Sequence, residues 1–216
     1  MRPDSKSHLN QASKWDTAGV LLDEAAASAG LLDLPALFGN ARPVELEIGS
    51  GKGTFLLARA AARADLNFLG LEWARAYCHY TADRIRRAGL GNVRMLRAEA
   101  GAFCRTCLPG RSIWRLHVYF PDPWPKRRHH HRRLIQPAFL DEVKRILRPG
   151  GQFIIVTDHL GYFSHIQRVM AEARGFASTD FPRMTGNDGE IVGTNFERKY
   201  IGQGRSFYWR AFMRYE

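Results

Sequence analysis

Short apolar runs alternate with longer amphipathic segments from residue 43 to the C-terminus. The apolar runs, each of a length typical of a strand, lie at residues 44–48, 67–71, 93–97, 116–120, 153–157 and 207–214. The segments between them that predict helices lie at residues 54–63, 74–88, 100–108, 137–147 and 162–174. Strands that alternate with helices in this way predict an α/β domain with a doubly wound, mostly parallel sheet.

Two local signals refine this pattern. Pro149-Gly150-Gly151 follows the helix at 137–147 and predicts its end. Residues 153–156 are apolar without interruption, which is typical of a strand that is buried on both faces. The first 40 residues differ, with a polar start and an Ala- and Leu-rich stretch at 17–32 that predicts a helix. We therefore expect a partly helical N-terminal extension over residues 1–40 and one domain over residues 41–216.

Composition narrows the class of protein. With 216 residues and 45% hydrophobic content, the chain suits a single well-cored domain. No apolar run approaches the ~20 residues that span a bilayer, and the polar start lacks a secretory signal. The three cysteines cannot close a disulfide framework, so we expect a cytoplasmic protein. The net charge of +11 favours an anionic partner, of which nucleic acid is the commonest.

A rigid loop with a strongly basic continuation follows the predicted strand at 116–120. Its sequence is Phe120-Pro121-Asp122-Pro123-Trp124-Pro125-Lys126, and the next seven residues are Arg127-Arg128-His129-His130-His131-Arg132-Arg133. Proline fixes φ and removes a backbone donor, so this segment cannot continue a central strand or a helix. A fixed carboxylate beside a cationic strip indicates chemistry on a polyanion.

A glycine-rich turn connects the first predicted strand to the first helix, with glycines at 49, 51 and 53. Glycines there allow a sharp turn and let a ligand lie against bare backbone. Their spacing differs from the G-x-G-x-x-G of dinucleotide sites, and Glu47 stands just ahead of them. A pyrophosphate gains little from Glu47, whereas a cationic ligand gains a partner.

Each of the first four predicted strands delivers a carboxylate at or near its carboxyl end: Glu47, Glu72, Glu99 and Asp122. Open parallel sheets bind their ligands at this edge. Glu72 is placed where a carboxylate accepts hydrogen bonds from a ribose diol. S-adenosylmethionine carries a sulfonium and an ammonium, so this acidic set fits it better than it fits NAD.

These residues together resemble the bacterial tRNA (guanine-46-N7)-methyltransferases. The resemblance covers roughly residues 44–215 and rests on the E-I-G-x-G-x-G turn, the P-D-P-W loop with Lys126 and Arg132-Arg133-Leu134, Thr157-Asp158, and Thr194-Asn195-Phe196-Glu197. It implies a Class I, Rossmann-like methyltransferase domain with seven strands, of which the last is antiparallel. It also implies S-adenosylmethionine as methyl donor, tRNA as partner, no obligatory protein partner, and a monomer or homodimer.

The resemblance also implies roles for individual residues. The donor would be held by Glu47, Gly49, Gly51, Gly53, Glu72, Glu99, Ala100 and Asp122. The guanine or tRNA side would be served by Lys126, Asp158, Thr194, Asn195, Phe196 and Glu197, and the RNA backbone by Arg127, Arg128, Arg132 and Arg133. Position 99 is usually Asp or Asn in this family. With glutamate here, either its side chain or the Ala100 amide contacts the adenine.

The chemistry that the resemblance implies needs alignment more than proton removal. Guanine N7 has an in-plane lone pair and no proton to lose, so no strong general base is required. We expect Asp122 to be the catalytic residue, stabilising the positive charge that passes to the purine. Asp158 or Glu197 would accept hydrogen bonds from the guanine N1 and N2 donors. Residues 186–193 predict a loop that closes over the substrate.

Two other functions stay open, and two motifs are set aside. The first is a Class I methyltransferase with another substrate, although such enzymes usually carry N-P-P-Y-like loops. The second is a catalytically silent RNA-binding module, which would not need Glu47 and the glycines. We expect no metal site, because Cys104-Arg-Thr-Cys107 lacks a second pair and the histidine triplet at 129–131 lies among arginines.

Overall fold

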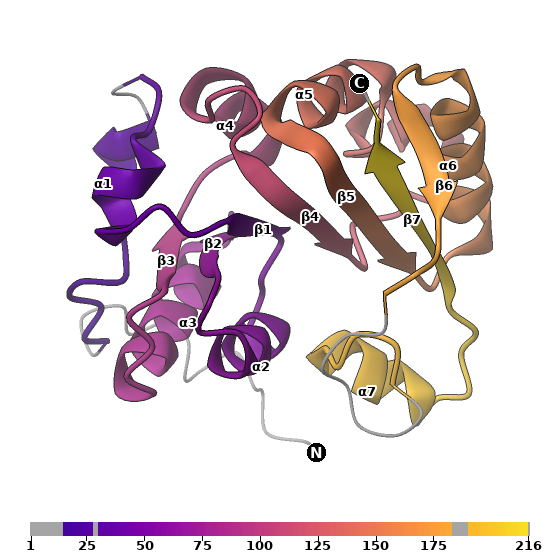
Figure 1. Ribbon diagram of the computed structural model, residues 1–216. Coiled ribbons are helices and arrows are strands. Elements are labelled where there is room, and N and C mark those ends of the chain that lie inside the picture. Colours follow the sequence, from indigo (N-terminus) through magenta and orange to yellow (C-terminus); the bar gives the residue numbers. More distant parts are fainter. Residues whose placement is uncertain (1–14, 28–29, 183–189, 216) are drawn as a thin grey trace.

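A seven-stranded sheet forms the centre of the protein (Figure 1), as seen in a computed structural model that describes residues 15–27, 30–182 and 190–215. The strand order is β3-β2-β1-β4-β5-β7-β6. The strands are β1 (Val44–Ile48), β2 (Asn67–Leu71), β3 (Val93–Leu96), β4 (Ile113–Tyr119), β5 (Leu147–Thr157), β6 (Phe176–Thr179) and β7 (Tyr208–Arg214). The first five are parallel neighbours, whereas β7 runs antiparallel to β5 and β6. The predicted mostly parallel sheet with an antiparallel last strand is confirmed.

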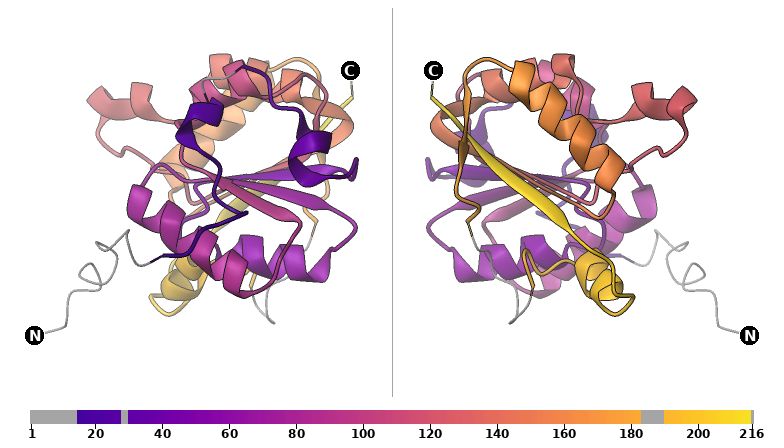
Figure 2. Two further views of the ribbon diagram at one scale, coloured as in Figure 1. Left: turned by 90° about the vertical axis from the view of Figure 1, so that its left-hand side faces the viewer. Right: turned by 90° about the vertical axis from the view of Figure 1, so that its right-hand side faces the viewer.

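Helices cover both faces of this sheet, which makes it doubly wound (Figure 2). One face carries α2 (Thr54–Ala62), α3 (Arg75–Arg87) and α7 (Asn195–Ile201). The opposite face carries α1 (Leu34–Phe38), α4 (Ala100–Cys107), α5 (Pro137–Ile146) and α6 (Leu160–Glu172). The largest apolar cluster lies on this second side and includes Leu46, Phe103, Leu116, Val143 and Ile166. Burial on both faces explains why the central strands read as continuous apolar runs.

The elements predicted between residues 44 and 174 agree with the structure to within a few residues at each end, with one informative difference. Strand β5 begins at Leu147, directly after α5, so Pro149, Gly150 and Gly151 lie inside the strand and not in a loop. The β4–β5 register shifts between Ile113 and Arg115, and Gly150 has φ 76°. A glycine within an irregular stretch of a strand accepts this conformation. The Pro-Gly-Gly pattern alone does not distinguish such a strand start from a loop that ends a helix.

The N-terminal helix predicted at 17–32 is wrong for the residues that the structure describes. Only a short 3-10 helix, η2 (Glu24–Ala27), forms there, and Leu21 makes a bridge to Met95 of edge strand β3. Val20 is buried with α2 and α3, whereas Leu22 and Leu32 pack on the other side of the sheet. This segment passes the edge of the sheet and packs apolar side chains against the clusters on both of its sides. It does so as an extended chain and not as a helix. The domain boundary at residue 40 stays a prediction.

Two further features bear on the site. The 3-10 helix η3 (Arg127–Arg132) projects away from the sheet in both views of Figure 2. Across the described part of the chain, no helix has both the length and the apolar character needed to cross a membrane.

Candidate active site

A cavity of about 1440 Å³ opens where the parallel strands end. Its wall includes all four carboxylates predicted for this edge: Glu47, Glu72, Glu99 and Asp122. Cationic side chains from the glycine turn, from the basic segment and from α7 also line it, namely Lys52, Arg132 and Lys199. The cavity therefore has carboxylates from the strand ends and basic groups from the surrounding loops and helix.

The glycine turn presents bare backbone to this cavity. Gly49 and Gly51 line it with φ of 78° and 52°, and a Cβ added at Gly49 would meet nothing within 4 Å. Gly53 serves a different purpose from the predicted donor contact, because it caps α2 and is not part of the cavity wall. A Cβ there would lie 2.4 Å from Thr81 Cγ2, so Gly53 allows α2 to start close to α3.

Glu47 is a buried carboxyl group in the cavity wall with an unsatisfied oxygen. It is 3% exposed, and its Oε2 has no hydrogen-bond partner among the residues that the structure describes. Burial raises the pKa of Glu47 to about 8; the Ser50 hydroxyl opposes this increase and the Glu72 carboxylate adds to it. A buried acceptor without a partner costs free energy unless a ligand supplies a donor. Glu47 is therefore placed to take up a cationic or hydrogen-bond-donating group.

Glu72 links the glycine turn to the start of α3. Its Oε2 accepts from the Gly51 amide at 2.8 Å, and its Oε1 accepts from the Ala74 amide at 2.8 Å. An ionised carboxylate has about four acceptor positions, so two remain for a ligand. This arrangement fits the predicted contact to a ribose diol.

Glu99 acts as the N-cap of α4. Its two oxygens accept from the Gly101 amide at 2.9 Å and the Ala102 amide at 2.7 Å. The Ala100 amide begins the helix and makes no hydrogen bond to another described residue. The Glu99 carboxylate keeps further acceptor positions as well, so both adenine contacts predicted from the sequence stay open.

Asp122 lies in the predicted loop and faces the cavity with an exposed side chain. Within the described residues no hydrogen bond or ion pair holds its carboxylate. The loop bends through two bulky residues with left-handed backbone, Phe120 with φ 51° and Trp124 with φ 44°. Such conformations cost about 1–3 kcal/mol each and persist where the surrounding structure enforces them. The Trp124 ring lies 5.0 Å from the Arg132 guanidinium and 5.9 Å from the His129 ring.

Arg133 does not have the RNA-backbone position expected from the sequence. It is 4% exposed, and its Nε donates to the Pro123 carbonyl at 2.9 Å. Its Nη2 donates to His130 Nε2 at 3.0 Å, and its guanidinium lies 5.0 Å from the Tyr162 ring centre. These contacts make Arg133 a clamp on the Asp122 loop. Arg127, Arg128 and Arg132 are exposed and keep the predicted access to RNA, and Lys126 is exposed outside the cavity wall.

The residues predicted to serve the guanine divide into two groups. Thr194, Asn195 and Phe196 line the cavity, with Phe196 47% exposed and stacked 6.3 Å from the Phe120 ring. Glu197 and Asp158 do not line it.

Glu197 and Asp158 have partners elsewhere. The fully buried Glu197 carboxylate accepts from three successive amides: Ile191, Val192 at 2.9 Å and Gly193 at 2.7 Å. Asp158 Oδ2 accepts from Arg205 Nη1 at 2.6 Å. The guanine-reading role expected of these two carboxylates is therefore not supported by the geometry. The first half of the predicted closing loop at 186–193, residues 186–189, lies outside the described residues, and its closure stays a prediction.

Other cavity residues were not anticipated from the sequence. They include Ser50, Phe55, Trp73, Tyr119 and Lys199. Trp73 is 64% exposed, with the Arg97 guanidinium 5.1 Å from its ring. The sequence feature that indicates Trp73 as a cavity residue is its position directly after Glu72, at a strand end. Tyr119 was hidden inside what reads as an apolar strand.

The Cys-x-x-Cys motif belongs to a helix in the structure. Cys104 and Cys107 are buried on α4, and burial raises the pKa of Cys104 to about 12. In the ranges that the structure covers, no three His, Cys, Asp or Glu side chains gather as a metal site.

Comparison with known proteins places these observations in a family. Residues 41–209 match the family described as "Putative methyltransferase". The chain is 35% identical over 221 residues to the tRNA (guanine-N(7)-)-methyltransferase of Nitrosococcus oceani, covering 99% of this chain and 86% of that protein. It is 39% identical to the protein of the same name from Halorhodospira halophila, covering 78% and 71%.

Solved structures show the same fold at low identity. The 16S rRNA methyltransferase KamB aligns with a TM-score of 0.59 at 18% identity, covering 85% of this chain and 93% of that one. A SAM-dependent methyltransferase from Aquifex aeolicus aligns with a TM-score of 0.55 at 14% identity, covering 89% and 99%. These likenesses concern the fold alone.

Proposed function

This chain belongs to the tRNA (guanine-N(7)-)-methyltransferase family, and we propose that it transfers the methyl group of S-adenosylmethionine to N7 of guanine 46 in the variable loop of tRNA. The observation that carries this proposal is Glu47, a buried carboxyl with an unsatisfied oxygen in the cavity. S-adenosylmethionine supplies a methyl group activated on a sulfonium, and it carries the ammonium that such an acceptor requires.

The donor side of the cavity has a matching group for each part of this ligand. Glu47 faces the cationic amino-acid end, and the backbone at Gly49 and Gly51 lets the ligand approach closely. Glu72 has acceptor positions left for the ribose diol. The Ala100 amide at the start of α4, which has no partner among the described residues, is available to an adenine nitrogen. All of these residues line the cavity.

On the target side, Asp122 is the residue proposed to act on the reacting atoms. The attack moves positive charge from sulfur to the purine, and a fixed carboxylate beside the ring favours this movement. No base is needed, so alignment of nitrogen, methyl and sulfur provides much of the acceleration. Asp122 is exposed to the cavity and has no partner in the described part of the chain, which leaves its oxygens free for this role.

Residues other than Glu197 and Asp158 are proposed to present the guanine, because these two carboxylates have protein partners and do not line the cavity. Phe196 offers an exposed aromatic face in the cavity wall, and Asn195 offers an amide with both donor and acceptor atoms. A base within folded RNA reaches such a pocket by leaving its stack. Phe196 is therefore proposed to stack on the target base and Asn195 to bond its edge.

The projecting segment η3 is the proposed guide for the tRNA backbone. Arg127, Arg128 and Arg132 are exposed on it, and Arg132 also reaches the cavity wall. Phosphate contacts of this kind give affinity that falls steeply with salt concentration. Because tRNA is the proposed substrate, the cytoplasm is the expected place of reaction.

The alternative of a silent RNA-binding module is disfavoured by the acidic half of the cavity. Carboxylates at four strand ends repel a polyanion and have no use in binding RNA alone. Incubation with tRNA and S-adenosylmethionine labelled on its methyl group tests the proposal. Label recovered as 7-methylguanosine supports it, and a chain that binds tRNA but neither S-adenosylmethionine nor S-adenosylhomocysteine would be a binding module.

A further inference from the structure

A buried chain of hydrogen bonds runs from the interior of the sheet to the cavity wall. Glu45 Oε2 lies 3.0 Å from His117 Nε2, and His117 Nδ1 lies 2.8 Å from the Tyr119 hydroxyl. Glu45 and His117 are buried in the sheet, whereas Tyr119 lines the cavity. None of these three residues has a role in the function proposed above.

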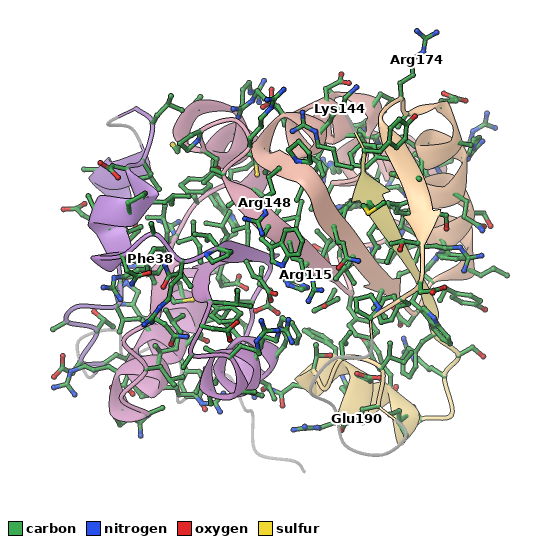
Figure 3. All side chains as sticks on the ribbon, in the orientation of Figure 1. Phe38, Arg115, Lys144, Arg148, Arg174 and Glu190 are labelled. Carbon is green, nitrogen blue, oxygen red and sulfur yellow. The ribbon has the colours of Figure 1, made fainter. Side chains whose placement is uncertain are left out.

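The charge of Glu45 sets the direction of the first hydrogen bond. Burial acts to raise the pKa of Glu45, but hydrogen bonds from His117 and Arg59 outweigh it and hold the pKa well below its usual range. Arg59 donates two of these bonds, at 2.9 and 3.0 Å, and Arg115 Nη1 lies 3.5 Å from Oε1. Arg115, labelled in Figure 3, lies near the start of β4, two residues before His117 on the same strand. An ionised carboxylate only accepts, so His117 Nε2 carries a proton.

The second hydrogen bond follows from the first. Burial lowers the pKa of His117 although Glu45 opposes the change, so the imidazole is neutral and Nδ1 has no proton. The Tyr119 hydroxyl must therefore donate to Nδ1. Its single proton is committed, and its oxygen offers only lone pairs to other groups.

The strand register places His117, the partner of this oxygen, next to Glu47. Glu47 is the Cα partner of His117 in the β1–β4 pair, and it points to the same face as Glu45, two residues earlier. Burial, followed by the charge of Glu47, raises the pKa of Tyr119, which indicates that the two side chains are near each other. The ring of Phe55, 4.9 Å away and edge-on, packs against the ring of Tyr119. Tyr119, with its hydroxyl fixed by His117, and Glu47, whose Oε2 has no partner among the described residues, therefore line the same cavity from neighbouring strands.

We propose that Tyr119 is a donor-binding residue whose hydroxyl oxygen accepts, together with Glu47, hydrogen bonds from the ammonium group of S-adenosylmethionine. His117 and Glu45 are positioning residues that fix this acceptor. An ammonium has three N–H donors and is satisfied by two or three acceptors at one place, which a single carboxylate oxygen does not provide. The inference rests on the proposed function, because it specifies one contact of the same ligand.

The test compares two ligands that differ in the amino-acid part. S-adenosylhomocysteine has the ammonium, whereas 5′-methylthioadenosine keeps the nucleoside and lacks the amino acid. For Y119F we expect the Kd of S-adenosylhomocysteine to rise about ten- to a hundredfold, the range for a hydrogen bond to a charged group, with the Kd of 5′-methylthioadenosine unchanged. H117L removes the acceptor that orients the hydroxyl and leaves Glu45 paired with Arg59, so it should show the same selective loss.

The matched control is Y162F. Tyr162 is also a buried tyrosine, but its hydroxyl accepts from the Ile135 amide at 3.1 Å and it does not line the cavity. Y162F should leave the affinities for both ligands unchanged.

Each outcome has a distinct meaning. If Y119F or H117L weakens the binding of both ligands equally, the hydrogen-bond chain has only a structural role, and the proposal is overturned. Unchanged affinity for S-adenosylhomocysteine would overturn it too. If Y119F does not fold, H117L carries the same comparison. A wild-type protein that binds neither ligand would instead contradict the proposed function itself.

Discussion

Arg133 Nε donates a hydrogen bond to the carbonyl oxygen of Pro123 at 2.9 Å, and this contact ties the end of the basic segment to the loop that carries Asp122. The same guanidinium bonds His130 and lies over the Tyr162 ring. One buried cation therefore connects the proposed tRNA guide, the proposed catalytic loop and helix α6. This relationship explains how a loop with two left-handed bulky residues is held in place.

R133K should lower methyl transfer about tenfold or more while the affinity for S-adenosylhomocysteine stays near that of the wild type. Lysine keeps the charge but lacks the planar fork that bonds Pro123 and His130 together. Single-turnover transfer and ligand titration measure the two effects. R127K, an exposed neighbour on η3, is the control and should transfer at nearly the wild-type rate. Equal behaviour of the two variants would show that the clamp has no influence on the loop.

Glu47 predicts a pH-dependent stability of the ligand-free protein. Its folded pKa, about 8, is above its ordinary value of 4.5, so the folded state binds more protons than the unfolded state between these values. The contribution of Glu47 to the free energy of unfolding is complete below about pH 4.5. It is lost as pH rises through about 8, at up to about 1.4 kcal/mol per pH unit. Urea unfolding of wild type and E47Q between pH 6 and 9 checks this. The free energy of unfolding should fall less steeply with pH in E47Q, because glutamine does not titrate.

Donor binding should show the opposite trend. A cationic ligand favours the ionised form of Glu47, so its affinity should increase as pH rises toward about 8. Titrations of S-adenosylhomocysteine at pH 6 and 8 measure this in wild type and E47Q. If the wild-type affinity does not depend on pH, or if E47Q keeps the full pH dependence, Glu47 does not interact with the cationic group of the ligand.

E197Q should destabilise the segment that precedes α7. The Glu197 carboxylate accepts from three backbone amides, and an amide side chain replaces one acceptor oxygen by a donor that faces them. We expect a loss of about 1–3 kcal/mol in the stability of this segment, seen as faster proteolysis near residue 191, and a higher KM for tRNA. E172Q, at the exposed end of α6, is the control. A stable E197Q protein that methylates transcripts with A at position 46 would instead indicate that Glu197 recognises the guanine.

Asp158 and Arg205 should behave as one unit. Their ion pair is partly exposed, so breaking it from either side should change global stability by less than about 1 kcal/mol. D158N and R205Q are then expected to reduce transfer to a similar extent, through the position of the segment between α7 and β7. Steady-state kinetics with tRNA measure both. Loss of transfer in D158N alone would mean that the carboxylate contacts the substrate.

The sequence predicted the sheet and the acidic edge well because both depend on local pattern. Apolar period and length located β1 and β2 to the residue, and the strand ends located Glu47, Glu72, Glu99 and Asp122. What the sequence did not predict depends on partners far away in the chain. Arg133 reads like its neighbours until its bonds to the Pro123 carbonyl and to Tyr162 are seen.

The same reason applies to two carboxylates that have protein partners. Glu197 and Asp158 belong to conspicuous motifs, and only the fold reveals that the amides at 191–193 and the side chain of Arg205 occupy them. Tyr119 was missed for the converse reason, since its hydrogen-bond partner His117 is two residues away inside an apolar strand.

The central claim is that this cavity brings a methyl donor and guanine 46 together at Asp122. Transfer of labelled methyl from S-adenosylmethionine to tRNA transcripts with G or A at position 46 tests it, with wild type and D122A assayed side by side. We expect label only in the G46 transcript, and a D122A protein that binds S-adenosylhomocysteine like the wild type but transfers at least a hundredfold more slowly, about 2.7 kcal/mol in the barrier. Equal labelling of both transcripts, or near-normal transfer by D122A, would contradict this account.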